Sequence, residues 1–141
     1  MLSEETKTHL INYSEKVPEG MRGRKATEED IQKFEKDFYP IPDDYKWILK
    51  NCYRVFFKAE WIDDIDELYE THKKFKKESS IENGWTLEGT FIMGWDGCGN
   101  PYGIELKTEK IVTEDHNFGG IHIIGQSLEE VLSPNHKKDN S

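Results

Sequence analysis

The sequence predicts an α+β fold, a single domain in which helices pack on an antiparallel meander sheet of about four to six strands. Two observations lead to this prediction. Apolar residues recur at helical spacing in the first part of the chain, whereas short alternating segments joined by tight turns fill residues 90–124. A length of 141 residues suits one domain with one core. We expect that domain over residues 1–132, with its core from residue 27 onward, and a polar tail over 133–141.

The first helix is expected over residues 3–16. Leu10, Ile11 and Tyr13 form its apolar side, and Ser3 is placed to cap its first turn. A short loop with three bases follows in an otherwise acidic chain, and we interpret it as a solvated connection. The bases are Arg22, Arg24 and Lys25.

The next helix starts at Thr27. Its hydroxyl can accept a hydrogen bond from an unpaired amide, and the three acids that follow favour the positive end of a helix. Ile31, Phe34 and Phe38, at spacings of three and four, form one apolar stripe. The stripe predicts that this helix packs on the core.

Two prolines separate this helix from the following one. Pro40 and Pro42 each push the residue before them out of the helical region. Asp43 is expected to cap the second helix, which runs through Leu49. Ile41, held between the prolines, is expected to fill the core where the two helices join.

A hairpin and a third long helix follow. Residues 53–62 are aromatic and β-branched, which favours a strand or hairpin. Asp63 opens the helix, with Ile65 and Leu68 facing inward, and residues 79–83 read as loop. Acids crowd the first half of the helix and lysines its end, a distribution that the helix dipole itself favours.

Four short strands then form the meander, over 90–95, 102–106, 111–116 and 121–124. Asp96 and Asn100 bound a turn with two glycines, and their side chains are expected to bond local amides. Ser127 and Glu130 match a capping box, which predicts a closing helix.

Charge excludes several classes of protein. Lysine and arginine number 19 and aspartate and glutamate 28, so the formal net charge is −9. That charge argues against a nucleic-acid-binding protein, which needs a basic face to neutralise phosphates. No apolar run approaches the ~18 residues of a membrane span, and no leader sequence opens the chain. We expect a cytoplasmic protein that binds neither nucleic acid nor membrane.

Cysteines and histidines give no metal or redox motif. Cys52 and Cys98 lie outside any CxxC, and we expect both to be reduced thiols. His116 and His122 can face each other across a hairpin, but two half-exposed strand histidines are the simpler interpretation. We expect no metal site and no cofactor.

Catalytic motifs are absent from the sequence as well. It contains no GxSxG, no P-loop and no recognisable Cys/His pair, so we expect no catalytic residues and no enzyme activity. Asp96, Glu105 and Asp115 can converge at one end of the meander. They leave a small carboxylate-dependent hydrolase as a minor alternative.

Four motifs occur in a recognisable order. They are Ile41-Pro42-Asp43-Asp44-Tyr45, residues 91–102 (FIMGWDGCGNPY), Asp115-His116, and residues 127–132 (SLEEVL). Together they resemble the SUKH superfamily, in particular its Smi/Knr-type branch, over residues 27–132. The resemblance implies an α+β fold and, in bacteria, an immunity protein that neutralises a toxin domain, often a nuclease, delivered by a neighbouring cell. Related fungal domains lie in a cell-wall regulator. Many relatives have Asn-Gly after the second helix, where this sequence has Asn51-Cys52-Tyr53.

The distribution of acids suggests how such a protein binds. Six acids and no base lie between Glu60 and Glu70, and eight acids and two bases between Leu87 and Leu132. Nucleases bind phosphate and therefore carry basic clefts. An acidic face competes for such a cleft and speeds the encounter.

The leading hypothesis is thus a binding module, an immunity protein that covers a basic toxin nuclease domain through an acidic surface. An intracellular regulatory or scaffold interaction domain is the alternative. The candidate partner-binding residues are Trp61, Asp63, Asp64, Asp66, Glu67, Asp96, Asn100, Tyr102, Glu105 and Asp115. Trp61 and Tyr102 are the candidate aromatic anchors, with core packing an equal interpretation for Trp61.

Two expectations follow from this hypothesis. If the face with Asp63, Asp64, Asp66 and Glu67 meets a basic cleft, replacing these four acids slows association and flattens its salt dependence. Stability should change little, because we expect these acids to be exposed. The protein is expected to be a monomer, or a weak homodimer paired through an exposed edge strand.

Overall fold

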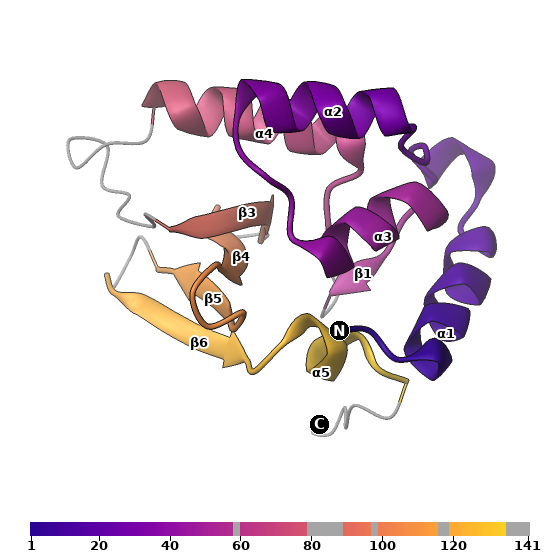
Figure 1. Ribbon diagram of the computed structural model, residues 1–141. Helices are drawn as coiled ribbons and strands as arrows, with labels where there is room; N and C mark the ends of the chain where they lie inside the picture. Colours follow the sequence, from indigo (N-terminus) through magenta and orange to yellow (C-terminus); the bar gives the residue numbers. More distant parts are fainter. Residues whose placement is uncertain (58–59, 79–88, 97–98, 116–118, 135–141) are drawn as a thin grey trace.

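The computed structural model describes residues 1–57, 60–78, 89–96, 99–115 and 119–134, with the side chains of Phe57, Glu60, Trp61 and residues 75–78 left out (Figure 1). The helices are α1 (Glu4–Glu15), the 3-10 helix η1 (Glu19–Met21), α2 (Glu28–Asp37), α3 (Asp43–Asn51), α4 (Ile65–Glu78) and α5 (Leu128–Leu132). The strands are β1 (Phe56–Phe57), β2 (Glu60–Trp61), β3 (Thr90–Trp95), β4 (Pro101–Glu105), β5 (Ile111–Glu114) and β6 (Ile121–Gly125). The predicted α+β fold is confirmed.

The main sheet is an antiparallel meander in the order β3-β4-β5-β6. Phe91, Ile104 and Ile111 lie side by side across three strands and face the main core. Since side chains alternate along a strand, the next row across the sheet faces the opposite side. That row contains Ile92 and Val112, which form a small buried cluster of their own.

Gly103 stands between Ile92 and Val112 in this row. A Cβ on Gly103 would lie 2.1 Å from the backbone oxygen of Phe91. Only glycine therefore fits at this close approach of two strands.

Helices cover one face of the sheet. In Figure 1, α2 and α4 lie next to each other along that face, and α4 packs on β3 while α2 packs on α4. Phe34 of α2 and Leu68 of α4 are fully buried, as the apolar stripes predict. Ile41 is 3% exposed and belongs to the main core, which confirms its predicted place between the two prolines.

The hairpin and the turn predicted in the middle of the chain are present. Strands β1 and β2 pair antiparallel. The Asp96 carboxylate accepts hydrogen bonds from the backbone amide of Asn100 (2.8 Å) and from its side-chain amide (3.1 Å). The loop predicted at 79–83 and the strand end at His116 lie outside the described residues.

Helix starts follow local sequence signals with two corrections. Ser3, Thr27 and Ser127 cap α1, α2 and α5 with their side chains, as predicted. Asp43 does not cap α3, because Pro42 occupies the capping position and Asp43 is already helical.

The second correction concerns α4. Asp64, and not Asp63, accepts a hydrogen bond from the backbone amide of Glu67 (2.9 Å) in the first turn of this helix. The backbone amide of Asp64 donates in return to the Glu67 carboxylate (3.2 Å). The pair forms a capping box one residue later than the sequence pattern suggested.

The two ends of the described chain meet. In Figure 1 the N-terminus lies beside α5. The Glu129 carboxylate accepts hydrogen bonds from the Ser3 backbone amide (2.8 Å) and the Thr6 hydroxyl (2.9 Å). One acid of α5 therefore holds the first turn of α1.

Candidate protein-interaction site

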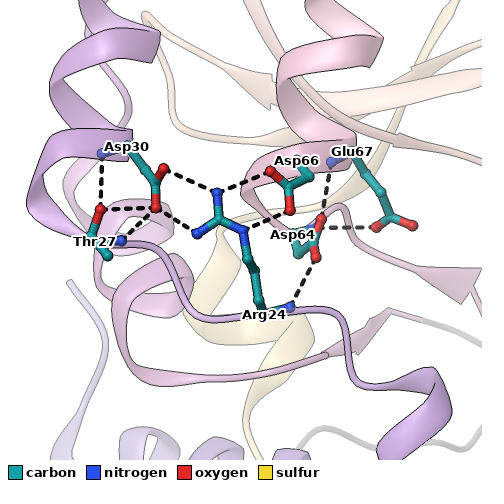
Figure 2. A network of polar contacts seen from close by, with 6 residues as sticks. All are labelled: Arg24, Thr27, Asp30, Asp64, Asp66 and Glu67. Carbon is teal, nitrogen blue, oxygen red and sulfur yellow. Dashed lines mark hydrogen bonds and ion pairs between the residues drawn. The ribbon is translucent and has the colours of Figure 1, made fainter.

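The acids at the start of α4 meet the basic loop that follows α1. We call Asp63, Asp64, Asp66 and Glu67 the entry cluster. In Figure 2 the guanidinium group of Arg24 lies between Asp30 and Asp66. It donates to both oxygens of Asp30 (2.7 and 3.0 Å) and to both oxygens of Asp66 (2.7 and 2.9 Å). These bonds lower the pKa of Asp30 and raise the pKa of Arg24.

Asp64 is an internal partner of the same loop. Asp64 is 8% exposed, and its carboxylate accepts a hydrogen bond from the backbone amide of Arg24 (3.0 Å). Gly23, with φ +71°, lets the loop approach, because a Cβ there would lie 2.4 Å from the Asp64 carboxylate. Glu67 is paired with Arg54.

The other two bases of the loop are also engaged. Arg22 donates to the backbone oxygens of Val17 (2.9 Å) and Glu15 (2.7 Å). Arg22 and Lys25 both lie over the ring of Tyr53, at 4.8 and 4.4 Å from its centre. The side chains of this loop therefore link α1, α2 and α4. The interpretation of the loop as a solvated connection is corrected.

Asp63 lies deeper than the other acids of the entry cluster. Its carboxylate accepts a hydrogen bond from the Thr71 hydroxyl (2.8 Å). Burial raises the pKa of Asp63 to about 7, and the nearby negative charges of Glu67 and Asp64 add to the rise. Because Asp63 and Asp64 are largely buried, and Asp66 and Glu67 are paired with arginines, the expectation of four freely exposed acids is corrected.

The acids of the meander do not form one group. Asp96 follows β3 and Asp115 follows β5, so both lie at the same end of the antiparallel sheet. Glu105 ends β4, which runs the other way, and accepts a hydrogen bond from the Thr108 hydroxyl (2.6 Å). Glu105 is therefore separated from the other two acids, and the expectation that all three carboxylates converge at one end of the meander is wrong.

The two aromatic candidates differ in what the structure says of them. Tyr102 is 2% exposed and belongs to the main core, which leaves it no surface for a partner. Trp61 pairs with Phe56 through its strand, and its side chain lies outside the described part.

His72 is a buried titratable group with a structural explanation. Its ring nitrogens lie 3.0 Å from the Leu68 backbone oxygen and 2.8 Å from the Tyr39 hydroxyl oxygen. Burial lowers the pKa of His72 to about 4, so the ring is neutral at physiological pH. Its contacts hold α4 to the segment after α2.

Within the described ranges, no group of three or more His, Cys, Asp and Glu side chains is arranged to hold a metal ion. Cys52 is a free, buried thiol, and Cys98 and His116 lie outside the described residues. No helix of the described part is both long and apolar enough to cross a membrane.

A groove that the sequence analysis did not predict borders the first turn of α3. Its volume is about 550 Å³. It is lined by residues 39–44, by Ile104, Leu106 and Glu109, by Ser127 and Leu128, and by Met1. Two of its acids, Asp43 and Glu109, are exposed, and no described residue pairs with either carboxylate. We call these two residues the rim acids.

The remaining acid of the groove is already bound. The Asp44 carboxylate accepts a hydrogen bond from the backbone amide of Leu2 (3.0 Å). The only sequence signals for the groove were the stiff Pro-Ile-Pro segment and an apolar residue, Leu106, at the end of an alternating strand.

A known protein family matches most of the chain. A family model described as the SMI1 / KNR4 family (SUKH-1) matches residues 25–133, which span α2 to α5 and all six strands. No curated protein matches the chain.

Proposed function

This chain belongs to the SMI1/KNR4 (SUKH-1) family, and from this membership we propose that it is a binding module that acts as an immunity protein. It neutralises a toxin domain by forming a stoichiometric complex with it in the cytoplasm. The toxin domain is a basic nuclease, and the complex covers its active site. The protein itself makes and breaks no covalent bond.

The observation that carries the proposal is the excess of acids. Even if every lysine and arginine of the chain were paired with an acid, 28 − 19 = 9 acids would remain. The entry cluster uses its acids internally, so the excess falls on other surfaces, which include the rim acids. Such a field attracts a basic cleft and raises the rate of encounter.

The alternative is a regulatory or scaffold domain like those of cell-wall regulators. Membership of the family is consistent with both roles, and the charge suits a basic regulatory partner equally well. The neighbouring gene separates the two. A long upstream gene with a variable C-terminal domain supports immunity, whereas neighbours for wall synthesis support regulation.

Co-expression tests the proposal. The toxin domain of the adjacent gene is expressed from an inducible promoter with and without this protein, and growth is followed. We expect growth only when this protein is present. The matched control is Gly103→Leu, which cannot form the close β3–β4 approach and should give no protection. Death of cells that contain both folded proteins would contradict the proposal.

A further inference from the structure

Three segments far apart in sequence build the groove. They are residues 39–44 between α2 and α3, the end of β4 with the turn after it, and the start of α5. The volume of about 550 Å³ lies within the roughly 300–1,000 Å³ of sites that take small molecules or a few side chains. The groove is therefore large enough to receive part of another chain.

The floor of the groove is apolar and stiff. It includes Ile41, Ile104 and Leu128, and Leu106 beside them is 43% exposed. Pro40 and Pro42 have no amide hydrogen, and the amide of Ile41 already donates to the Glu35 carboxylate (2.8 Å). The 39–44 segment thus offers few donors to a ligand backbone. It is suited to apolar side chains, and its fixed φ angles reduce the ordering cost of binding.

The rim of the groove is negative. Of the described residues that line it, three are acids and none is a lysine, arginine or histidine. The positive group among them is the α-amino group of Met1, which pairs with the Asp44 carboxylate (3.3 Å), so the net charge of the lining is still negative. Asp44 is engaged by Leu2, which leaves the rim acids Asp43 and Glu109 for a ligand. Asp43 is also explained by the dipole of α3, since it lies in the first turn. Glu109 needs a different explanation.

Glu109 has φ +64°, the only positive φ of a non-glycine residue in the described ranges. Glycine or asparagine would occupy this turn position at lower cost, since the left-handed region costs an ordinary residue about 1 kcal/mol. An exposed carboxylate is thus held on the rim against the conformational preference of the turn.

We propose, on the premise of the proposed function, that this groove is the contact site for the toxin. It receives a segment of that basic protein which places an apolar side chain on the floor beside Leu106 and a lysine or arginine beside Asp43 and Glu109. A second copy of this chain is a poor occupant, because its net charge is −9 and the rim is negative.

Two variants and a matched control test the site. The first variant, Asp43→Asn/Glu109→Gln, removes the rim charge at constant shape. The second, Leu106→Ser, removes the exposed apolar contact. The control, Glu19→Gln/Glu29→Gln, removes two charges from exposed acids that do not line the groove. Circular dichroism and urea unfolding verify that all of them fold.

Calorimetric titration with an inactive form of the toxin domain from the adjacent gene is the first measurement. We expect each groove variant to weaken binding roughly tenfold and the control to change it less than about twofold. If wild type and all variants bind the toxin equally, the groove inference is overturned and the proposed function stands.

A second probe works without the toxin. The peptide Ac-Lys-Leu-Lys-NH₂ is titrated into the ¹⁵N-labelled protein, with Ac-Glu-Leu-Glu-NH₂ as its charge-reversed control. We expect shifts of amides in segments 39–44 and 104–110 with the lysine peptide only, and loss of these shifts in Asp43→Asn/Glu109→Gln. If this pattern appears although the toxin does not bind, the toxin is not the partner, and the groove remains a site for cationic peptides. Amide shifts confined to other parts of the protein overturn the inference. So do shifts in the groove that depend on the concentration of the protein and not on that of the peptide, because they indicate that a second copy of this chain occupies the groove.

Discussion

The entry cluster and the rim acids are alike in charge and differ in what surrounds them. Arg24 and Arg54 pair with Asp66 and Glu67, and burial in the fold raises the pKa of Asp63. Asp43 and Glu109 lie exposed at an apolar groove.

The difference separates two uses of acids in one chain. Removing a carboxylate from the entry cluster leaves donors without an acceptor or relieves a buried charge, so the free energy of unfolding changes. Removing a rim acid affects no internal contact, so the effect falls on binding. Three predictions test this separation.

The largest expected effect is on Asp63 and depends on pH. The pKa of Asp63 is about 7 in the fold against an ordinary value of 3.8, so the native state holds this proton more tightly than the unfolded chain. The stability linked to this group is fully present below pH 4 and is lost as the pH rises toward 7. Asp63→Asn cannot titrate there. The variant should therefore gain stability relative to wild type between pH 4 and pH 7, by at most about 4 kcal/mol.

Urea unfolding of both proteins at pH 4, 5, 6 and 7 measures this difference. The wild-type curve alone is less informative, because the pKa of His72 is lowered to about 4 and its contribution to stability rises with pH over the same range. Both proteins contain His72, so its contribution cancels. A stability difference that stays constant with pH would place Asp63 with the exposed acids.

The next effect is on Asp64. In Asp64→Ala the amides of Arg24 and Glu67 lose their acceptor, and both hydrogen bonds are partly buried. We expect a loss of about 2–3 kcal/mol in the free energy of unfolding. The matched change on the groove, Asp43→Ala, should cost less than about 0.5 kcal/mol. Equal losses at the two positions, measured by urea midpoints, would remove the distinction between the two regions.

The smallest effect is a gain. Glu109→Gly should stabilise the fold by about 0.5–1 kcal/mol, because glycine adopts positive φ without steric cost. The same change at Lys107, an exposed neighbour in the turn without positive φ, should destabilise slightly. Thermal unfolding measures both. If Glu109→Gly also weakens toxin binding, this residue favours binding at the expense of stability. If Glu109→Gly instead destabilises the protein, the glutamate side chain itself stabilises the turn, and the prediction is wrong.

Local physics made most of the fold predictable from the sequence. The capping pairs Thr27–Asp30 and Ser127–Glu130 join residues that are only three positions apart in the sequence, and the apolar stripe of α2 spans seven positions. The burial of Tyr102 also follows from a local pattern, the alternation of side chains along a strand. Tyr102 stands two residues before Ile104 in an alternating strand and therefore faces the same buried side.

The site was less predictable because its determinants are distant in sequence. Arg24 and Asp66 are 42 residues apart, and nothing in either neighbourhood indicates the other. The groove joins Pro40, Leu106 and Leu128 from three segments that are far apart in the chain, and only the tertiary fold brings them together. A run of acids in a sequence gives the charge of a segment and not its exposure.

The bonds between Glu129 and the first turn of α1 bear on synthesis of the protein. Ser3 and Thr6 leave the ribosome more than a hundred residues before Glu129, so α1 must wait for its partner through most of translation. Until then Leu10 on its buried side stays without its final neighbours and is open to chaperones. Nascent chains stalled before residue 129 should therefore be cut by protease within α1, and full-length chains should resist cleavage there.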